Sequence, residues 1–193
     1  VVIEKMSIRK AELQDMRPSG GGKTRLVMHA PARGMVGYHG EFLTDTRGSG
    51  VMNRLFHAWE PWKGEIPGRR NGALISNDKG QSTAYALWNL EERGQMFIAD
   101  GEDVYEGMVI GENSRSDDLD VNPLKGKKLT NVRASGKDET IRLTPPRRLT
   151  LEQAMAWIED DELVEVTPAA IRIRKAYLDP NERKKQQRAK EAG

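Results

Sequence analysis

Within residues 1–64 the hydrophobic positions follow helical spacing in some stretches and strand spacing in others. An apolar stripe at Val2, Ile3 and Met6 predicts a helix over residues 2–9. The elements predicted after it are strands at Leu13–Met16 and Thr24–Ala30, a helix over 35–46, and a strand at Val51–Trp59. Helix, strand, strand, helix, strand is the order of a ferredoxin-like βαββαβ sandwich without its first strand, so this module is expected to be truncated at its N-terminus.

From about Glu65 the pattern changes to short β-rich runs separated by recurring glycines. Such runs predict a small barrel-like or sandwich domain. One helix is predicted after Thr150, because Thr150 and Gln153 have capping-box spacing before a helical apolar stripe. The predicted strands are Ala73–Ser76, Ser82–Leu90, Met96–Ile98, Met108–Ile110, Lys128–Val132, Glu139–Leu143, Glu162–Val166 and Ile171–Ile173.

These patterns predict an α+β chain in three parts. Residues 1–64 form the truncated ferredoxin-like module, and residues 65–178 form the β-rich, barrel-like domain with one helix. Residues 112–138 are a long polar segment, a kind of loop that is usually functional or disordered. Residues 179–193 are a basic tail that is polar on all sides, so a solvated helix or a flexible segment is expected there.

Composition narrows the class of protein. Charged residues make up 31% and hydrophobic residues 37% of the chain, a balance typical of a soluble globular protein. The chain has no cysteine, which excludes disulfides, thiolate zinc sites and cysteine nucleophiles and fits a reducing cytoplasm. No signal peptide or membrane-length apolar run is visible. The net charge of +2 gives no global argument for nucleic acid, and the first residue, Val1, suggests a piece of a longer protein.

Motifs for catalysis or metal binding are incomplete. Gly22-Lys23-Thr24 resembles the end of a phosphate-binding P-loop, but Arg17 stands where that motif requires glycine, so a hairpin turn is predicted. The three histidines show no metal-ligand spacing, and Asp117–Asp120 lacks a calcium-loop pattern and is expected to be a solvated acidic turn. Glu159–Glu162 is interpreted as a charged helix end. No nucleophile and base can be paired, so no catalytic site is predicted.

Two local features bear on binding. Trp59 and Trp62 flank the predicted domain junction and either pack between domains or offer a base-stacking platform. The run 125–137 carries Lys125, Lys127, Lys128, Arg133 and Lys137 without an acid, together with the hydrogen-bonding residues Asn131 and Ser135. Such a run is typical of a segment that contacts a polyanion, so we predict nucleic-acid binding there. The similarly basic residues 183–190 serve either solubility or binding.

Long runs of the chain closely resemble the TypA/BipA family of translational GTPases. They are RGMVGYHGEFLTDTRGSGVMNRLFHAWEPWKGEI (33–66), NGALIS (71–76), TAYALWNLEERG (83–94), VYEGMVIGENSR (104–115), KLTNVRASGKDE (128–139), LTPPRRLTLEQAMAWIEDDELVEVTP (143–168) and IRIRK (171–175). The resemblance implies that residues 1–64 are a module shared with elongation factor G. It implies that the remainder is the C-terminal domain peculiar to this family.

The resemblance also implies a function. It implies a monomeric, cytoplasmic, ribosome-associated factor acting in large-subunit assembly, translation, and stress or cold adaptation. Residues 114–137 would reach toward the peptidyl transferase centre and the acceptor end of A-site tRNA. The five basic residues of the run would contact rRNA phosphates, whereas Arg115, Asn131 and Ser135 would contact sugars, bases or tRNA end groups. GTP and Mg would bind an upstream domain, so no cofactor and no membrane contact are expected for these residues.

Two rival interpretations differ in class. A protein–protein adaptor would use sheet edges and the Trp59/Trp62 region, with basic residues serving only solubility. A hydrolase built on scattered carboxylates has no identifiable nucleophile.

Overall fold

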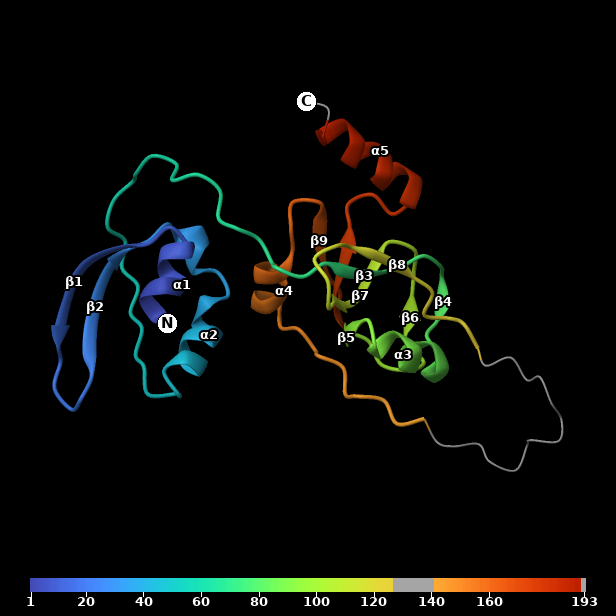
Figure 1. Cartoon of the computed structure of the whole chain (residues 1–193), viewed down its shortest axis with the longest axis horizontal. Helices are drawn as coiled ribbons and strands as arrows, with labels where there is room; N and C mark the ends of the chain where they lie inside the picture. The colour runs from blue at the N-terminus through green and yellow to red at the C-terminus, as the bar shows by residue number, and fades with distance from the viewer. Residues whose placement is uncertain (127–140, 192–193) are drawn as a thin grey trace. The chain divides into compact units, whose positions relative to one another are not determined.

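The computed structural model describes residues 1–126 and 141–191, and these fall into two compact units, Val1–Gly68 (unit 1) and Arg69–Gly193 (unit 2). Both units mix helices with sheet, so the predicted α+β class is confirmed (Figure 1). No helix among the described residues is long and apolar enough to cross a membrane. Predicted strands at Lys128–Val132 and at residues 139–140 lie outside the described residues, and residues 141–143 adopt no strand.

Unit 1 is built on one hairpin and two helices. Its small core joins Met6 and Tyr38, both buried, with Met28 and Phe42 packed against them. The helix predicted over 2–9, the first two strands and the helix over 35–46 are therefore confirmed within a few residues. The elements are α1 (Val2–Ile8), β1 (Glu12–Pro18), β2 (Thr24–His29), a 3-10 turn η1 (Ala32–Met35) and α2 (Tyr38–Asp45).

The glycine triplet closes the β1–β2 hairpin. Pro18 pairs with Thr24, and Gly20, Gly21 and Gly22 between them all have positive φ angles, a conformation that glycine adopts without strain. The Ser19 N–H donates to the Lys23 carbonyl at 2.9 Å. The predicted hairpin turn is confirmed, and a phosphate-binding loop between a strand and a helix is wrong for this position.

The strand predicted at Val51–Trp59 is wrong. This stretch runs from α2 without regular secondary structure, and its large side chains are exposed. This stretch and the residues after it contact the hairpin through side chains, with His57 stacked on His29 and Lys63 Nζ 2.9 Å from Glu12. A strand needs an unpaired edge with which to exchange backbone hydrogen bonds, and no described strand pairs with these residues.

Unit 2 is a mixed sheet with a helix on each face. Strands follow the order β8-β3-β7-β10-β9, and β5 pairs with β7 beside β10. Only β3 and β8 are parallel. Within the described residues this path is open, and because the strand predicted at Lys128–Val132 lies outside them, the barrel-like arrangement stays a prediction. The elements are β3 (Ala73–Ser76), β4 (Gly80–Gln81), α3 (Ala84–Glu91), β5 (Gly94–Met96), β6 (Asp103–Val104), β7 (Met108–Asn113), β8 (Leu119–Val121), α4 (Leu151–Trp157), β9 (Glu162–Val166), β10 (Ile171–Lys175) and α5 (Pro180–Glu191).

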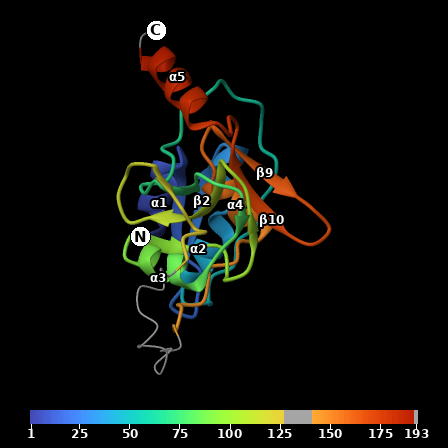
Figure 2. The same ribbon diagram turned by 90° about the vertical axis from the view of Figure 1, so that its right-hand side faces the viewer.

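Both faces of the sheet are buried. Leu74 and Ile110 pack on Leu87 of α3, whereas Ile75 and Val109 belong to the cluster that holds Trp157 of α4. Burial on both faces explains why β3 and β7 are continuous apolar runs rather than alternating ones. Figure 2 shows the β9–β10 hairpin at the far edge of this sheet.

Two elements of unit 2 differ from the prediction, and one matches it closely. The strand predicted at Ser82–Leu90 is wrong, because most of this stretch belongs to helix α3 (Ala84–Glu91), so the expectation of a single helix is also wrong. Part of the polar segment 112–138, residues 119–121, is strand β8. The capping box is confirmed, because the Gln153 N–H donates to the Thr150 hydroxyl and the Thr150 N–H donates to the Gln153 side chain.

Candidate nucleic-acid interface

The described residues on either side of 127–140 attach to opposite ends of helix α3. At the start of the helix, the Thr83 hydroxyl donates to the Lys125 carbonyl at 3.1 Å while it also accepts from the Ala86 N–H. At the end of the helix, Glu91 Oε1 accepts from the Thr144 N–H at 2.5 Å. The backbone on either side of residues 127–140 is therefore fixed on one eight-residue helix.

Arg115 lies in the turn after β7, where three hydrogen bonds hold the backbone of residues 114 and 115. Its carbonyl accepts from the Gly72 N–H at 2.7 Å, and its N–H donates to Asn113 Oδ1 at 3.3 Å. The preceding Ser114 N–H donates to the carbonyl of Arg93, two residues beyond α3. Arg115 is thus brought close to the C-terminal end of α3, and Lys125 to its N-terminal end. The structure places these two predicted residues around the same helix.

The other predicted contact residues cannot be placed in the same way. Lys127, Lys128, Asn131, Arg133, Ser135 and Lys137 all lie outside the described residues. Their predicted roles stay predictions.

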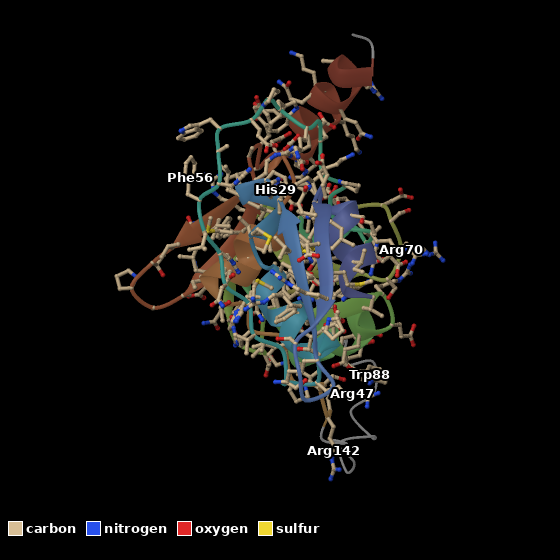
Figure 3. All side chains as sticks on the ribbon, turned by 90° about the vertical axis from the view of Figure 1, so that its left-hand side faces the viewer. His29, Arg47, Phe56, Arg70, Trp88 and Arg142 are labelled. Carbon is tan, nitrogen blue, oxygen red and sulfur yellow. The ribbon has the colours of Figure 1, made fainter. Side chains whose placement is uncertain are left out.

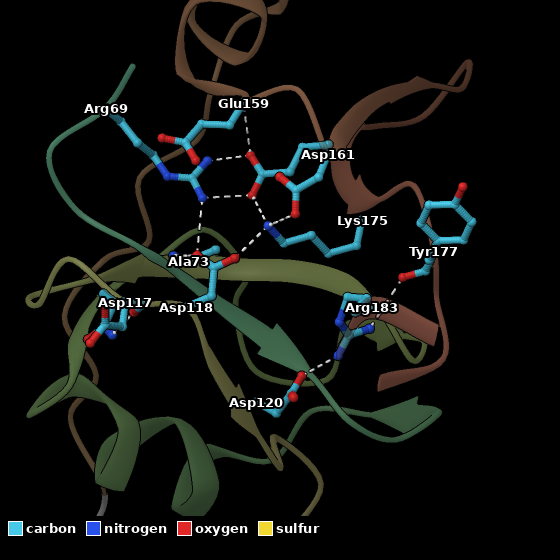
Figure 4. A network of polar contacts seen from close by, with 12 residues as sticks. Arg69, Ala73, Asp117, Asp118, Asp120, Glu159, Asp161, Lys175, Tyr177 and Arg183 are labelled. Carbon is cyan, nitrogen blue, oxygen red and sulfur yellow. Dashed lines mark hydrogen bonds and ion pairs between the residues drawn. The ribbon is translucent and has the colours of Figure 1, made fainter. Parts of the chain in front are cut away.

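A network of ion pairs fixes the turn that carries Arg115 (Figure 4). Asp118 Oδ1 accepts from the Ala73 N–H at 2.7 Å, and Asp118 Oδ2 lies 2.5 Å from Lys175 Nζ. Glu162 Oε1 lies 2.9 Å from the same Nζ, and both terminal nitrogens of Arg69 donate to the Glu162 carboxylate. The side chains of Lys175 and Glu162 are 2% and 0% exposed, so this is a buried network in which each charge has a partner.

Sequence reasoning missed this network. The expected charged helix end at Glu159–Glu162 is wrong, because Glu162 begins β9 and is buried. The expected solvated acidic turn is also wrong, since Asp118 pairs with Lys175 and Asp120 pairs with Arg183 of α5. One signal was available: Lys175 shares the inward face of β10 with the buried Ile173, and a lysine on such a face requires a buried acid.

The network is charged at neutral pH. Burial raises the pKa of Asp118, but hydrogen bonds from Lys175 and Ala73 outweigh it and hold that pKa below its usual range. Burial lowers the pKa of Lys175, but Glu162, Asp118 and Asp161 hold it above its usual value. Asp118 therefore contributes stability that is lost as the pH falls through its lowered pKa. Lys175 contributes stability that is lost as the pH rises through its raised pKa.

Glu159→Gln is expected to stabilise unit 2 at neutral pH. Burial raises the pKa of Glu159, and although Arg69 opposes this effect, the charges of Glu162 and Asp118 add to it. A raised carboxyl pKa means that the ionised side chain costs stability at neutral pH, and this cost vanishes as the pH falls below the ordinary carboxyl value. Urea midpoints at about pH 7 and about pH 4 measure the difference, which should shrink in acid.

The control for this prediction is Glu152→Gln, which removes a carboxylate from the first turn of α4. Because a carboxylate there interacts favourably with the helix N-terminus, its removal should lower stability at neutral pH. Equal shifts of the same sign in both variants would contradict the burial effect at Glu159.

In unit 1, a polar cluster joins β2 to the segment after α2. Ligand atoms of His29, His57 and Glu60 lie within 4.8 Å of one another, the one such group of three found among the described residues. No spacing in the sequence predicts this cluster, since His29 and His57 are distant along the chain. Lys63 Nζ already lies 3.0 Å from Glu60, so a divalent cation would compete with an ammonium group for that carboxylate. The cluster is accounted for as a contact within the fold.

Trp59 and Trp62 remain on the surface. The Trp59 ring is 93% exposed and meets Phe56 edge-on, whereas the Arg33 guanidinium lies 3.6 Å from the centre of the Trp62 ring. Neither contact distinguishes packing between domains from base stacking.

Comparison with known proteins assigns both parts of the chain. Residues 71–180 match the family described as TypA/BipA C-terminal domain, and residues 1–70 match the one described as elongation factor G C-terminus. The protein named large ribosomal subunit assembly factor BipA from Escherichia coli K12 is 50% identical over 97% of this chain and 31% of its own length. Proteins of the same name from Haemophilus influenzae and Bacillus subtilis are 52% and 44% identical over 97% and 95% of this chain, and 30% of their own lengths.

The chain thus spans about a third of the length of these relatives, at their matched C-terminal domains. A model match over more than half of the chain, with such identity across nearly all of it, settles the relationship: this chain belongs to the TypA/BipA family.

Proposed function

We propose that this chain is the part of a TypA/BipA-like translational GTPase that docks on the large ribosomal subunit. The name of the relatives, large ribosomal subunit assembly factor, supports the partner. The observation that carries the proposal is the attachment of Lys125, the first residue of the acid-free run 125–137, to the start of α3, with Arg115 beside the same helix. The five positive charges of this run would neutralise RNA phosphates.

In the proposed mechanism this chain positions the factor and performs no chemistry. Lys125, Lys127, Lys128, Arg133 and Lys137 contact rRNA phosphates, and Arg115, Asn131 and Ser135 contact sugars, bases or the acceptor end of A-site tRNA near the peptidyl transferase centre. GTP and Mg bind a preceding domain, whose state controls docking. The protein acts in the cytoplasm as a monomer, in assembly and in stress or cold adaptation. Residues 1–64 form a ferredoxin-like sandwich once a preceding strand is added.

Replacing Lys127, Lys128 and Arg133 together by Gln is expected to weaken binding to purified large subunits. Each lost phosphate contact should reduce the slope of log affinity against log salt by about 0.7–0.9, because fewer counterions are released. Cosedimentation over a salt series measures both quantities.

A matched control removes three positive charges elsewhere. Lys184, Lys185 and Arg188 lie on the exposed α5, and their replacement by Gln changes the net charge equally. The proposal expects a clearly smaller effect from this control. Unchanged affinity and salt slope in the first variant, or equal losses in both, would refute docking by the basic segment.

A protein–protein adaptor is the second candidate, because unit 1 exposes Leu55, Phe56, Trp59 and Trp62 within one short segment. Exposed apolar side chains gathered in this way are typical of protein contacts. Association with ribosomal particles that survives nuclease digestion and high salt, and that is lost on Phe56→Ser with Trp59→Ser, would favour the adaptor over RNA docking.

A further inference from the structure

Helix α3 has one face in the core and presents aromatic side chains on the other. Ala86 and Leu87 are buried against the sheet. Trp88 is 51% exposed at the surface of unit 2, and Tyr85, one helical turn before it, is partly exposed (Figure 3). The exposed half of the Trp88 ring and the exposed part of Tyr85 are available to a ligand.

A groove of about 460 Å³ lies along this helix. Tyr85, Asn89 and Arg93 line it from α3 and the residues that follow, and Asn122 and Lys125 line it from the segment after β8. Its volume is in the range of small-ligand sites, roughly 300–1,000 Å³, which is large enough for a nucleotide. The groove therefore combines an aromatic ring, two side-chain amides and two cations.

The charge around the groove favours an anion along one side. Among the described residues, the side chains of Arg93 and Lys125 make no ion pair, and both residues are exposed. Asp120 also lines the groove, but its carboxylate is paired with Arg183. Glu92 is exposed one turn after Trp88, so a phosphate chain would have to follow the side of Arg93 and Lys125.

Aromatic faces beside cations are the recognition pattern of unpaired nucleotides. Every base has a π-face that stacks on an aromatic ring, and amide groups bond base edges, whereas a duplex keeps its bases stacked inside. An acidic peptide would use the cations but would have no use for the exposed ring. The observations therefore favour single-stranded RNA over a protein ligand.

We infer that α3 is a stacking platform for unpaired nucleotides of RNA, with Tyr85 in the groove and Trp88 on the adjoining exposed part of the helix stacking on bases, and Arg93 and Lys125 bonding the phosphates. This inference deepens the proposed function and rests on it for the source of the RNA. Since the basic run 125–137 begins at Lys125, which is attached to the start of α3, the platform and those charges would act on one strand.

The test uses the full 193-residue chain and a short unstructured RNA oligonucleotide carrying a fluorophore. Fluorescence anisotropy at low salt compares it with a duplex of the same sequence and with a strand of abasic nucleotides. Trp88→Ala should weaken binding of the single strand roughly tenfold, the loss expected for one stacked base. Trp88→Phe should restore most of the affinity. Lys125→Gln should weaken binding of the abasic strand as much as that of the normal strand.

Trp59→Ala is the control, because it removes from unit 1 a tryptophan that is more exposed than Trp88, 93% against 51%. It should leave oligonucleotide binding unchanged, and circular dichroism should show that both alanine variants are folded. Equal affinity of the wild-type chain and Trp88→Ala for the oligonucleotide, an equal loss in Trp59→Ala, or tighter binding of the duplex would overturn the inference. If the wild-type chain and Trp88→Ala bind the oligonucleotide equally well, the Trp88 surface would be assigned to a protein contact.

Failure of this inference can be told from failure of the proposed function. If the Lys127, Lys128 and Arg133 variant loses large-subunit binding while Trp88→Ala binds the oligonucleotide normally, the platform is wrong and docking stands. If large subunits do not bind the wild-type chain but Trp88→Ala loses oligonucleotide binding, the platform stands and its RNA comes from elsewhere.

Discussion

Glu162→Gln is expected to lower the free energy of unfolding of unit 2 by about 3–5 kcal/mol, the usual cost of breaking a buried ion pair. Glu162 and Asp118 each contact both cations, but the Glu162 side chain is 0% exposed and that of Asp118 is 36% exposed, so Glu162 is the fully buried acid of the network. The amide keeps the size of the side chain but carries no charge, and its nitrogen is placed against a donor. Two buried cations are then left with Asp118 and Asp161 alone.

The matched control is Glu102→Gln, the same substitution in the Glu102–Arg148 pair, where the Arg148 side chain is 60% exposed. Exposed pairs contribute about 0–1 kcal/mol, and the new amide oxygen still accepts from the Ala99 N–H. Because the chain has two units, amide hydrogen exchange of peptides from β7 to β10 should be followed instead of a global signal. Losses of similar size in the two variants would show that Glu162 is not held as described.

Ile110→Ala should cost unit 2 about 2–5 kcal/mol, the range measured for such truncations in protein cores. Ile110 is 0% exposed, lies on the central strand β7 and packs in the cluster that joins the sheet to α3. The cavity cannot collapse easily, because β3 pairs with β7 on one side and β5 and β10 pair with it on the other.

Ile171→Ala is the control, since it removes the same atoms from a side chain that is 37% exposed on β10. A much smaller loss is expected because that site remains in contact with water. Denaturant midpoints of unit 2, read by hydrogen exchange as above, compare the two variants. A loss below about 1 kcal/mol in Ile110→Ala would mean that the cluster around it is loosely packed.

Local signals in the sequence were sufficient for several elements. Thr150 and Gln153 determine the start of α4 by a hydrogen-bond exchange within one turn. Gly20–Gly22 determine a hairpin turn because the backbone there needs positive φ angles. The strands Ala73–Ser76 and Glu162–Val166 were predicted with their observed bounds, as each is a β-rich run between clear breaks.

The secondary-structure predictions were wrong where the local sequence is compatible with more than one type of element. Ser82–Leu90 contains Tyr85, Trp88 and two leucines, residues compatible with either element, and the Thr83 cap decides for a helix that covers the sheet. Val51–Trp59 has the composition of a strand but pairs with no described strand. Because this segment is not paired into a sheet, its aromatic side chains remain exposed.

By itself, the sequence determined the α+β class, the capped start of α4, the β1–β2 hairpin turn and the basic segment. Through its close resemblance it also determined the TypA/BipA family. The tertiary structure decided which charges are buried together and which residues surround α3. Glu162, Lys175 and Arg69 meet only because β9, β10 and the segment that leads into β3 converge in the folded unit. Local patterns specify elements because the interactions involved span one turn or one strand. Local patterns cannot specify contacts between residues that are distant in the sequence, because those contacts depend on how whole helices and strands pack.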